Sequence, residues 1–105
     1  MNLNEYQEAA TDTCIHTAYN QNYLIAGLVA EAGEVAGKYA KHIRDETPFV
    51  ELTDELKKEL GDVLWFVAVL ANYHFISLET IARINIDKLQ SRKERGVLGG
   101  SGDNR

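Results

Sequence analysis

An unbroken apolar run at residues 63–71 (VLWFVAVLA) is the feature that most constrains how this chain can fold. On composition alone the run could be a buried strand, but it continues a segment whose helical pattern starts near Leu56, so we interpret it as helix. A helix that is apolar all round must be covered on every side. A chain of 105 residues has room for one small core. The run therefore predicts a single helical domain that is completed by oligomerisation.

The remaining pattern predicts four helices in all. They cover residues 4–19, residues 22–44, a third helix from the N-cap Thr53 to about residue 75, and a fourth from the N-cap Ser77 to about residue 95. Pro48 falls in a predicted loop at 45–52, and Gly96 stands where a C-terminal glycine is expected. We therefore predict an all-α, four-helix bundle over residues 1–96, followed by a flexible tail at 97–105.

The helix predicted at residues 22–44 has two packing faces. One is a stripe of large residues: Leu24, Leu28, Val35 and Tyr39. A nearly opposite stripe holds only small ones: Ala26, Ala30, Gly33, Gly37 and Ala40. A glycine inside a helix costs about 1 kcal/mol relative to alanine. We therefore expect another helix to approach the small stripe closely, as in a multi-helix assembly.

Composition and charge exclude several classes of protein. The formal charge is −5 and no basic run is present, so binding of polymeric nucleic acid or anionic membrane through the overall field is not expected. The single cysteine, Cys14, excludes an internal disulfide and a cysteine-based zinc site. The N-terminal segment lacks a signal-peptide pattern, and the apolar run is too short to span a bilayer. We therefore expect a cytoplasmic protein.

Two pairs of acidic residues carry the main chemical signal. Glu31 and Glu34 stand three apart on the second helix, and Glu59 and Asp62 stand three apart on the third. Residues three apart share one side of a helix, and both pairs border the large apolar stripes that we expect to pack together. Like charges gathered in a partly buried place are unfavourable unless a cation joins them. Four carboxylates suit a hard ion, first Mg²⁺ and then Mn²⁺.

The alternative interpretation is a solvated helix surface on which the acids pair with lysines four residues away. The pairs would be Glu34 with Lys38 and Lys58 with Asp62. Spacing alone leaves both interpretations open. The dipeptide Gly61-Asp62 favours a site, because both residues are poor choices for the interior of a helix.

The fourth helix provides a second signal. Asn85 lies in the middle of its apolar stripe, and Lys88 and Arg92 flank the same side. A buried amide needs partners, and the two cations could hold phosphate oxygens. Alone, this pattern is more typical of a structurally bonded Asn with a basic rim. Joined to a metal site, the same residues would form a phosphate clamp.

A base pocket is less clearly marked. Phe66 lies one turn beyond Asp62 and could stack on a nucleobase, as could Trp65 or Tyr6, although each is more typical of a core. Lys38 lies near the acidic face and could reach phosphates.

Three stretches together resemble the MazG-like, all-alpha nucleoside triphosphate pyrophosphohydrolases. They are LVAEAGEVA at residues 28–36, ELGDVLW at 59–65 and NIDKLQSR at 85–92. The family pattern is Glu-x-x-Glu, a variable gap, Glu-x-x-Asp, and then a helix with Asn, Lys and Arg. Either acidic pair alone would be a weak signal, whereas all the parts in this order are fairly specific. The resemblance covers most of residues 5–96.

The resemblance implies a homodimer or homotetramer that hydrolyses a nucleoside triphosphate to the monophosphate and pyrophosphate. The implied catalytic residues, which would also be ligands of one or two Mg²⁺ ions, are Glu31, Glu34, Glu59 and Asp62, and Glu34 is our choice for the base that accepts a proton from water. The implied substrate-binding residues are Asn85, Lys88 and Arg92. The positions of Lys38 and Phe66 beside the acidic pairs add these two as further candidates for substrate binding.

Two other functions remain open at this level. Phosphoribosyl-ATP pyrophosphohydrolase is a related helical enzyme that cleaves the same bond, although residues 61–65 resemble the MazG-like pattern better. The second open function is that of a helical module that binds nucleotides without hydrolysing them. The intact set of four acids argues against this function.

Overall fold

The computed structural model describes all residues, 1–105, as α-helices joined by short turns, without a β-strand. The elements are α1 (Leu3–Asp12), the 3-10 turn η1 (His16–Ala18), α2 (Gln21–Asp45), α3 (Phe49–Tyr73) and α4 (Leu78–Glu94). The predicted all-α class with four α-helices is confirmed.

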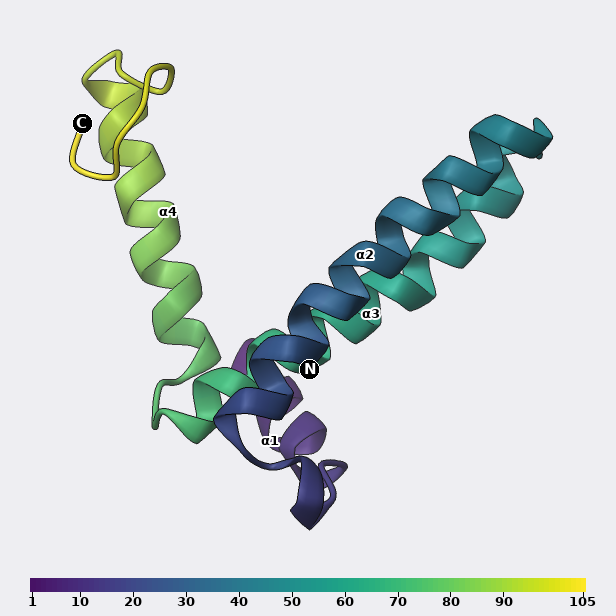
Figure 1. The fold of residues 1–105 in the computed structure, drawn as a ribbon. Coiled ribbons are helices and arrows are strands. Elements are labelled where there is room, and N and C mark those ends of the chain that lie inside the picture. Colours follow the sequence, from purple (N-terminus) through teal and green to yellow (C-terminus); the bar gives the residue numbers. More distant parts are fainter.

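The helices are arranged as two arms that meet at a common base (Figure 1). One arm is the long antiparallel hairpin of α2 and α3, which lie side by side. The other arm is α4, which leaves the end of α3 at a bend of 106° and points away from the hairpin. Helix α1 packs at the base, against α3 and α4. No single helix is long and apolar enough to span a membrane. By length and composition, only α3 and α4 taken together would be, and these two helices are sharply bent relative to each other.

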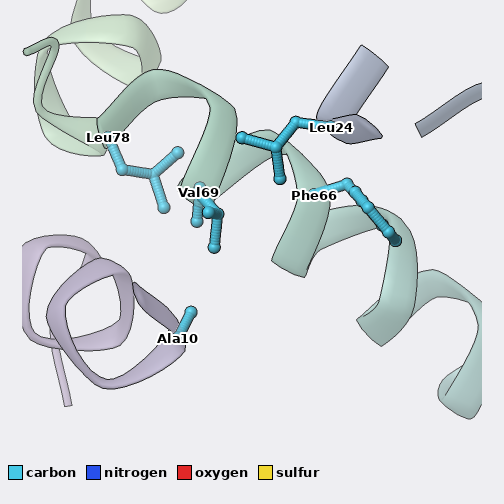
Figure 2. Packing of buried hydrophobic residues seen from close by; sticks show 6 residues of the cluster. Ala10, Leu24, Phe66, Val69 and Leu78 are labelled. Carbon is cyan, nitrogen blue, oxygen red and sulfur yellow. The ribbon is translucent and has the colours of Figure 1, made fainter. Parts of the chain in front are cut away.

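The core lies at the base, where all four helices contribute to it. It contains Ala10, Leu24, Phe66, Ala68, Val69 and Leu78, several of which are labelled in Figure 2. Leu24 and Val69 are fully buried. The apolar run of α3 supplies half of this cluster, as its composition predicts.

A buried glutamine fixes the corner between α3 and α4. The Gln7 amide nitrogen donates hydrogen bonds to the carbonyl oxygens of Ala68 (3.0 Å) and Ile76 (2.9 Å). Its amide oxygen accepts a hydrogen bond of 2.9 Å from the main-chain nitrogen of Leu78, at the start of α4. All three bonds join residues far apart in sequence, so α1 holds the corner in place. Phe75, inside this corner, has a φ of 60° and is 98% exposed.

Two predicted helix boundaries are wrong. The first helix ends at Asp12 instead of residue 19, because its end is rich in residues of low helix propensity and the Thr13 hydroxyl and the Trp65 indole both bond the Ala10 carbonyl. The third helix begins at Phe49, after Pro48 at its N-cap. Thr53 is not a cap, since its hydroxyl donates to the Phe49 carbonyl inside the helix.

Two predicted helix-terminal residues are confirmed. The Ser77 hydroxyl accepts a hydrogen bond of 3.1 Å from the main-chain nitrogen of Thr80, so Ser77 caps α4. Gly96 follows α4 with a φ of 71°, a left-handed conformation that favours glycine.

Much apolar surface is left open in the single chain, where only 11 of 105 residues are buried. Both arms expose large side chains: Ile25, Val29, Ile43, Leu60, Leu64, Ile84 and Ile86. The small stripe of α2 has no close neighbour, because a Cβ at Gly33 or Gly37 would meet nothing within 4 Å. The close approach occurs at Gly27, where a Cβ would overlap the Phe66 ring.

Candidate metal and nucleotide site

Three of the four predicted acids converge on the hairpin. Glu31 comes from α2, and Glu59 and Asp62 come from α3. One carboxylate oxygen from each lies within 4.8 Å of the others. Glu31 and Glu59 are half-buried, and Asp62 is exposed. Each pair projects from one side of its helix, as its spacing predicts, and the packing of α2 on α3 brings the two sides together.

The cluster makes one of its members, Glu31, less acidic. Burial raises the pKa of Glu31 above its usual range, and the nearby Asp62, Glu59 and Glu34 carboxylates raise it further. The negative charges therefore oppose one another, and a divalent cation would relieve this repulsion.

No protein cation neutralises the cluster. The ion pairs in the chain are Arg44–Asp45, Lys57–Asp54, Arg83–Glu79, Lys88–Asp103 and Arg92–Asp103. Neither pair expected for a solvated lysine–acid surface, Glu34 with Lys38 or Lys58 with Asp62, is among them. An uncompensated group of carboxylates that can all reach one point fits a hard, oxygen-preferring ion such as Mg²⁺.

Glu34 and Lys38 lie beside the cluster without being part of it. Glu34 is exposed and does not belong to the group of oxygens that converge, although its charge acts on Glu31. Lys38 is half-buried and forms no ion pair.

The predicted phosphate-binding residues lie on the other arm. Asn85 is exposed, Lys88 is half-buried and Arg92 is buried, all on α4. Because α4 points away from the hairpin (Figure 1), its C-terminal half and the acidic cluster are separated within one chain. The Arg92 guanidinium is bonded instead to main-chain oxygens of residues 102 and 103, so the segment predicted to be flexible is folded back onto α4.

The structure places two of the aromatic candidates in packing roles. Phe66 is 8% exposed and packs in the core against Trp65 and Tyr23, so protein side chains cover the ring that was predicted to stack on a base. The Trp65 indole nitrogen donates hydrogen bonds to the Ala10 carbonyl (3.1 Å) and the Thr13 hydroxyl (2.7 Å). Both findings agree with the core interpretation that the sequence favoured for these rings.

Tyr6 lies at an open cleft instead. The cleft has a volume of about 550 Å³ and is lined by the start of α1 together with Leu64 of α3 and Glu79 of α4. Burial raises the pKa of the Tyr6 hydroxyl, and the Asp62 carboxylate adds to the rise. One acid of the cluster therefore acts electrostatically on the ring at this cleft. The sequence suggested Tyr6 only as one of three aromatic candidates, because nothing local distinguishes it from a core residue.

Comparison with protein-family models matches residues 20–97 to the MazG nucleotide pyrophosphohydrolase domain. The chain belongs to the MazG family. The match contains the acidic pairs of α2 and α3 and the polar residues of α4, whereas α1 of this MazG domain, with Tyr6 and Gln7, lies outside it.

Two relatives of this MazG domain extend the comparison. Gene 37 protein of Mycobacterium phage L5 is 46% identical over 114 aligned positions, which cover 100% of both chains. Uncharacterized protein YvdC of Bacillus subtilis (strain 168) is 33% identical over 85 positions, covering 74% of this chain and 80% of its own. No solved structure gives a significant match.

Proposed function

We propose that this MazG domain is a Mg²⁺-dependent nucleoside triphosphate pyrophosphohydrolase that converts a (d)NTP and water to a (d)NMP and pyrophosphate. The observation that carries the proposal is the convergence of Glu31, Glu59 and Asp62 from two helices without a protein cation beside them. Family membership supports the class of reaction.

The acidic residues would have two roles. Glu31, Glu59 and Asp62 would hold Mg²⁺, or Mn²⁺ as a substitute, and the bound ion would neutralise phosphate charge and make water more acidic. Glu34, beside the cluster, would accept the proton of the water that attacks the α-phosphorus. The bond from that phosphorus to the bridging oxygen then breaks, and pyrophosphate leaves with the bonding electrons.

The nucleoside would occupy the cleft beside Tyr6. The cleft volume of about 550 Å³ lies within the range of about 300–1,000 Å³ that is common for small-molecule sites. A half-buried ring at its wall offers a stacking surface. Phosphates that extend from the cleft toward Asp62, whose charge acts on this ring, would reach the acidic cluster.

The active form would be a homodimer or homotetramer. Both arms expose large apolar side chains, among them Val29, Leu60 and Ile84, which a second copy of the chain would cover. A second copy that covers these faces could also bring the α4 of one chain, with Asn85, Lys88 and Arg92, to the acidic cluster of the other. Sedimentation velocity that gives only a monomer would contradict this part of the proposal. The substrate class implies a cytoplasmic location.

The test is a pyrophosphate-release screen over canonical and modified nucleotides with Mg²⁺, with Mn²⁺ and with EDTA. We expect metal-dependent release, and we expect Glu59→Gln to lower the rate by about 10²–10³-fold. Glu55→Gln, one turn earlier on α3, is the matched control that removes the same charge outside the cluster. Equal loss in the two variants would contradict the assignment.

Two outcomes would favour the other functions. Turnover confined to phosphoribosyl-ATP would identify the related enzyme class. Binding of nucleotides without release of pyrophosphate under any condition would identify a non-catalytic module.

A further inference from the structure

One cation near the end of α4, Arg92, is covered by the C-terminal segment of the same chain. Arg92 is only 5% exposed. Its Nη2 atom donates hydrogen bonds to the main-chain oxygens of Asp103 (2.6 Å) and Gly102 (3.3 Å). The partners that bury this guanidinium are therefore atoms of residues 102 and 103, which follow Arg92 by 10 and 11 positions in the sequence.

The same segment places negative charge beside the cations. The Asp103 carboxylate lies 3.9 Å from Nη2 of Arg92 and 4.0 Å from Nζ of Lys88. Nη2 of Arg95 donates a hydrogen bond of 2.7 Å to the main-chain oxygen of Arg105. A carboxylate and several carbonyl oxygens thus lie against three cations, and such oxygens resemble what phosphate offers to arginine.

The segment folds on itself and is held on α4 by polar contacts. The Arg105 guanidinium bonds the carbonyl oxygens of Leu98, Gly99 and Gly102. Gly100 and Gly102 have φ values of 94° and 91°, which favour glycine and allow the tight loop. Leu98 remains 51% exposed, so no large apolar anchor is buried. Because a polar contact exchanges readily for a stronger polar ligand, the segment is suited to displacement.

We propose that residues 98–105 are an autoinhibitory plug that competes with the polyphosphate of the substrate for Lys88 and Arg92. The inference rests on the proposed function, in which these two residues hold phosphate. Phosphate oxygens bind an arginine fork more strongly than main-chain carbonyls do. A polyphosphate therefore displaces the plug, and the plug weakens binding of every ligand that needs these cations.

The test measures binding separately from turnover. Inorganic tripolyphosphate is titrated by calorimetry in EDTA into the full chain, into a chain that ends at residue 97, and into Asp103→Asn. We expect the truncated chain to bind about tenfold more tightly and Asp103→Asn to bind more tightly by a smaller factor. Glu94→Gln is the charge-matched control, since Glu94 is exposed on α4 and forms no ion pair, and it should leave the affinity unchanged.

Further readouts keep the two proposals distinguishable. Arg92→Ala introduced into the truncated chain should abolish the gain in affinity, and in the full chain tripolyphosphate should shift the amide resonance of Gly102. In the hydrolysis assay, truncation should lower KM with kcat unchanged. Equal tripolyphosphate affinity of full and truncated chains, or no binding to either, overturns the plug. Absence of pyrophosphate release from every chain, with the affinity difference intact, overturns the hydrolase proposal alone.

Discussion

Replacing Asp62 with Asn should stabilise the metal-free protein while abolishing its response to Mg²⁺. The oxygens of Asp62, Glu31 and Glu59 that converge lie within 4.8 Å of one another. At that separation two unit charges repel by about 0.9 kcal/mol in a water-like dielectric, which is the appropriate one because Asp62 is exposed. Asp62 takes part in two such pairs, and salt at physiological strength reduces their sum to about 1 kcal/mol.

Urea denaturation with and without Mg²⁺ measures both effects. In EDTA, Asp62→Asn should raise the free energy of unfolding by about 1 kcal/mol. Added at ten times its Kd, Mg²⁺ should stabilise the wild type by about 1.4 kcal/mol and the variant by much less. Glu55→Gln controls for the loss of one negative charge on α3 and should keep the Mg²⁺ response. A less stable Asp62→Asn in EDTA, or an equal Mg²⁺ response in both proteins, would refute the argument that these carboxylates repel one another until a cation joins them.

Other properties of the fold can be tested in the same way. Because the pKa of Glu31 is raised in the folded state, its contribution to stability is complete below its ordinary pKa of about 4.3 and is lost as the pH rises through the raised value. Over this pH range the free energy of unfolding of the metal-free wild type should therefore fall relative to that of Glu31→Gln. Parallel plots of unfolding free energy against pH for the two proteins would contradict the raised pKa. Gln7→Ala removes the three hydrogen bonds of a buried side chain and should lower the free energy of unfolding by about 2–4 kcal/mol in urea denaturation, whereas exposed Glu8→Ala should change it by less than about 0.5 kcal/mol. Gly27→Ala should overpack the core, destabilise the fold by about 1–3 kcal/mol and so lower the midpoint of thermal unfolding. Gly33→Ala, with open space around its Cβ, should raise that midpoint in the isolated chain. A higher midpoint in both variants would show that the Phe66 ring packed at Gly27 moves aside at little cost.

The acidic cluster was largely predictable because its parts are local. Residues three apart on a helix must share a side, so the Glu59–Asp62 pair follows from helical periodicity. That pair then comes close to Glu31 as soon as the two adjacent helices pack together through their apolar stripes. The choice between a metal site and a lysine-paired surface was not predictable, because it depends on side-chain partners that spacing alone leaves open. The structure leaves the cluster without a lysine partner.

The predicted phosphate clamp shows where local pattern stops being informative. The sequence places Asn85, Lys88 and Arg92 on one helix, but nothing in it gives the direction of that helix. The direction is set at the corner between α3 and α4, where Phe75 adopts a φ of 60° and Gln7 bonds both sides of the turn. These contacts join residues about 60 to 70 positions apart.

The sequence alone determined the all-α class, two of the helix-terminal residues and the acids that share a helix side, because periodicity and capping act within a few residues. Three outcomes depended on the folded chain as a whole: which acids converge, where the two arms diverge at the base, and that the C-terminal segment covers Arg92. Those outcomes depend on contacts between distant segments, whose free energies are set by packing and hydrogen bonding in three dimensions and not by the identity of neighbours along the chain.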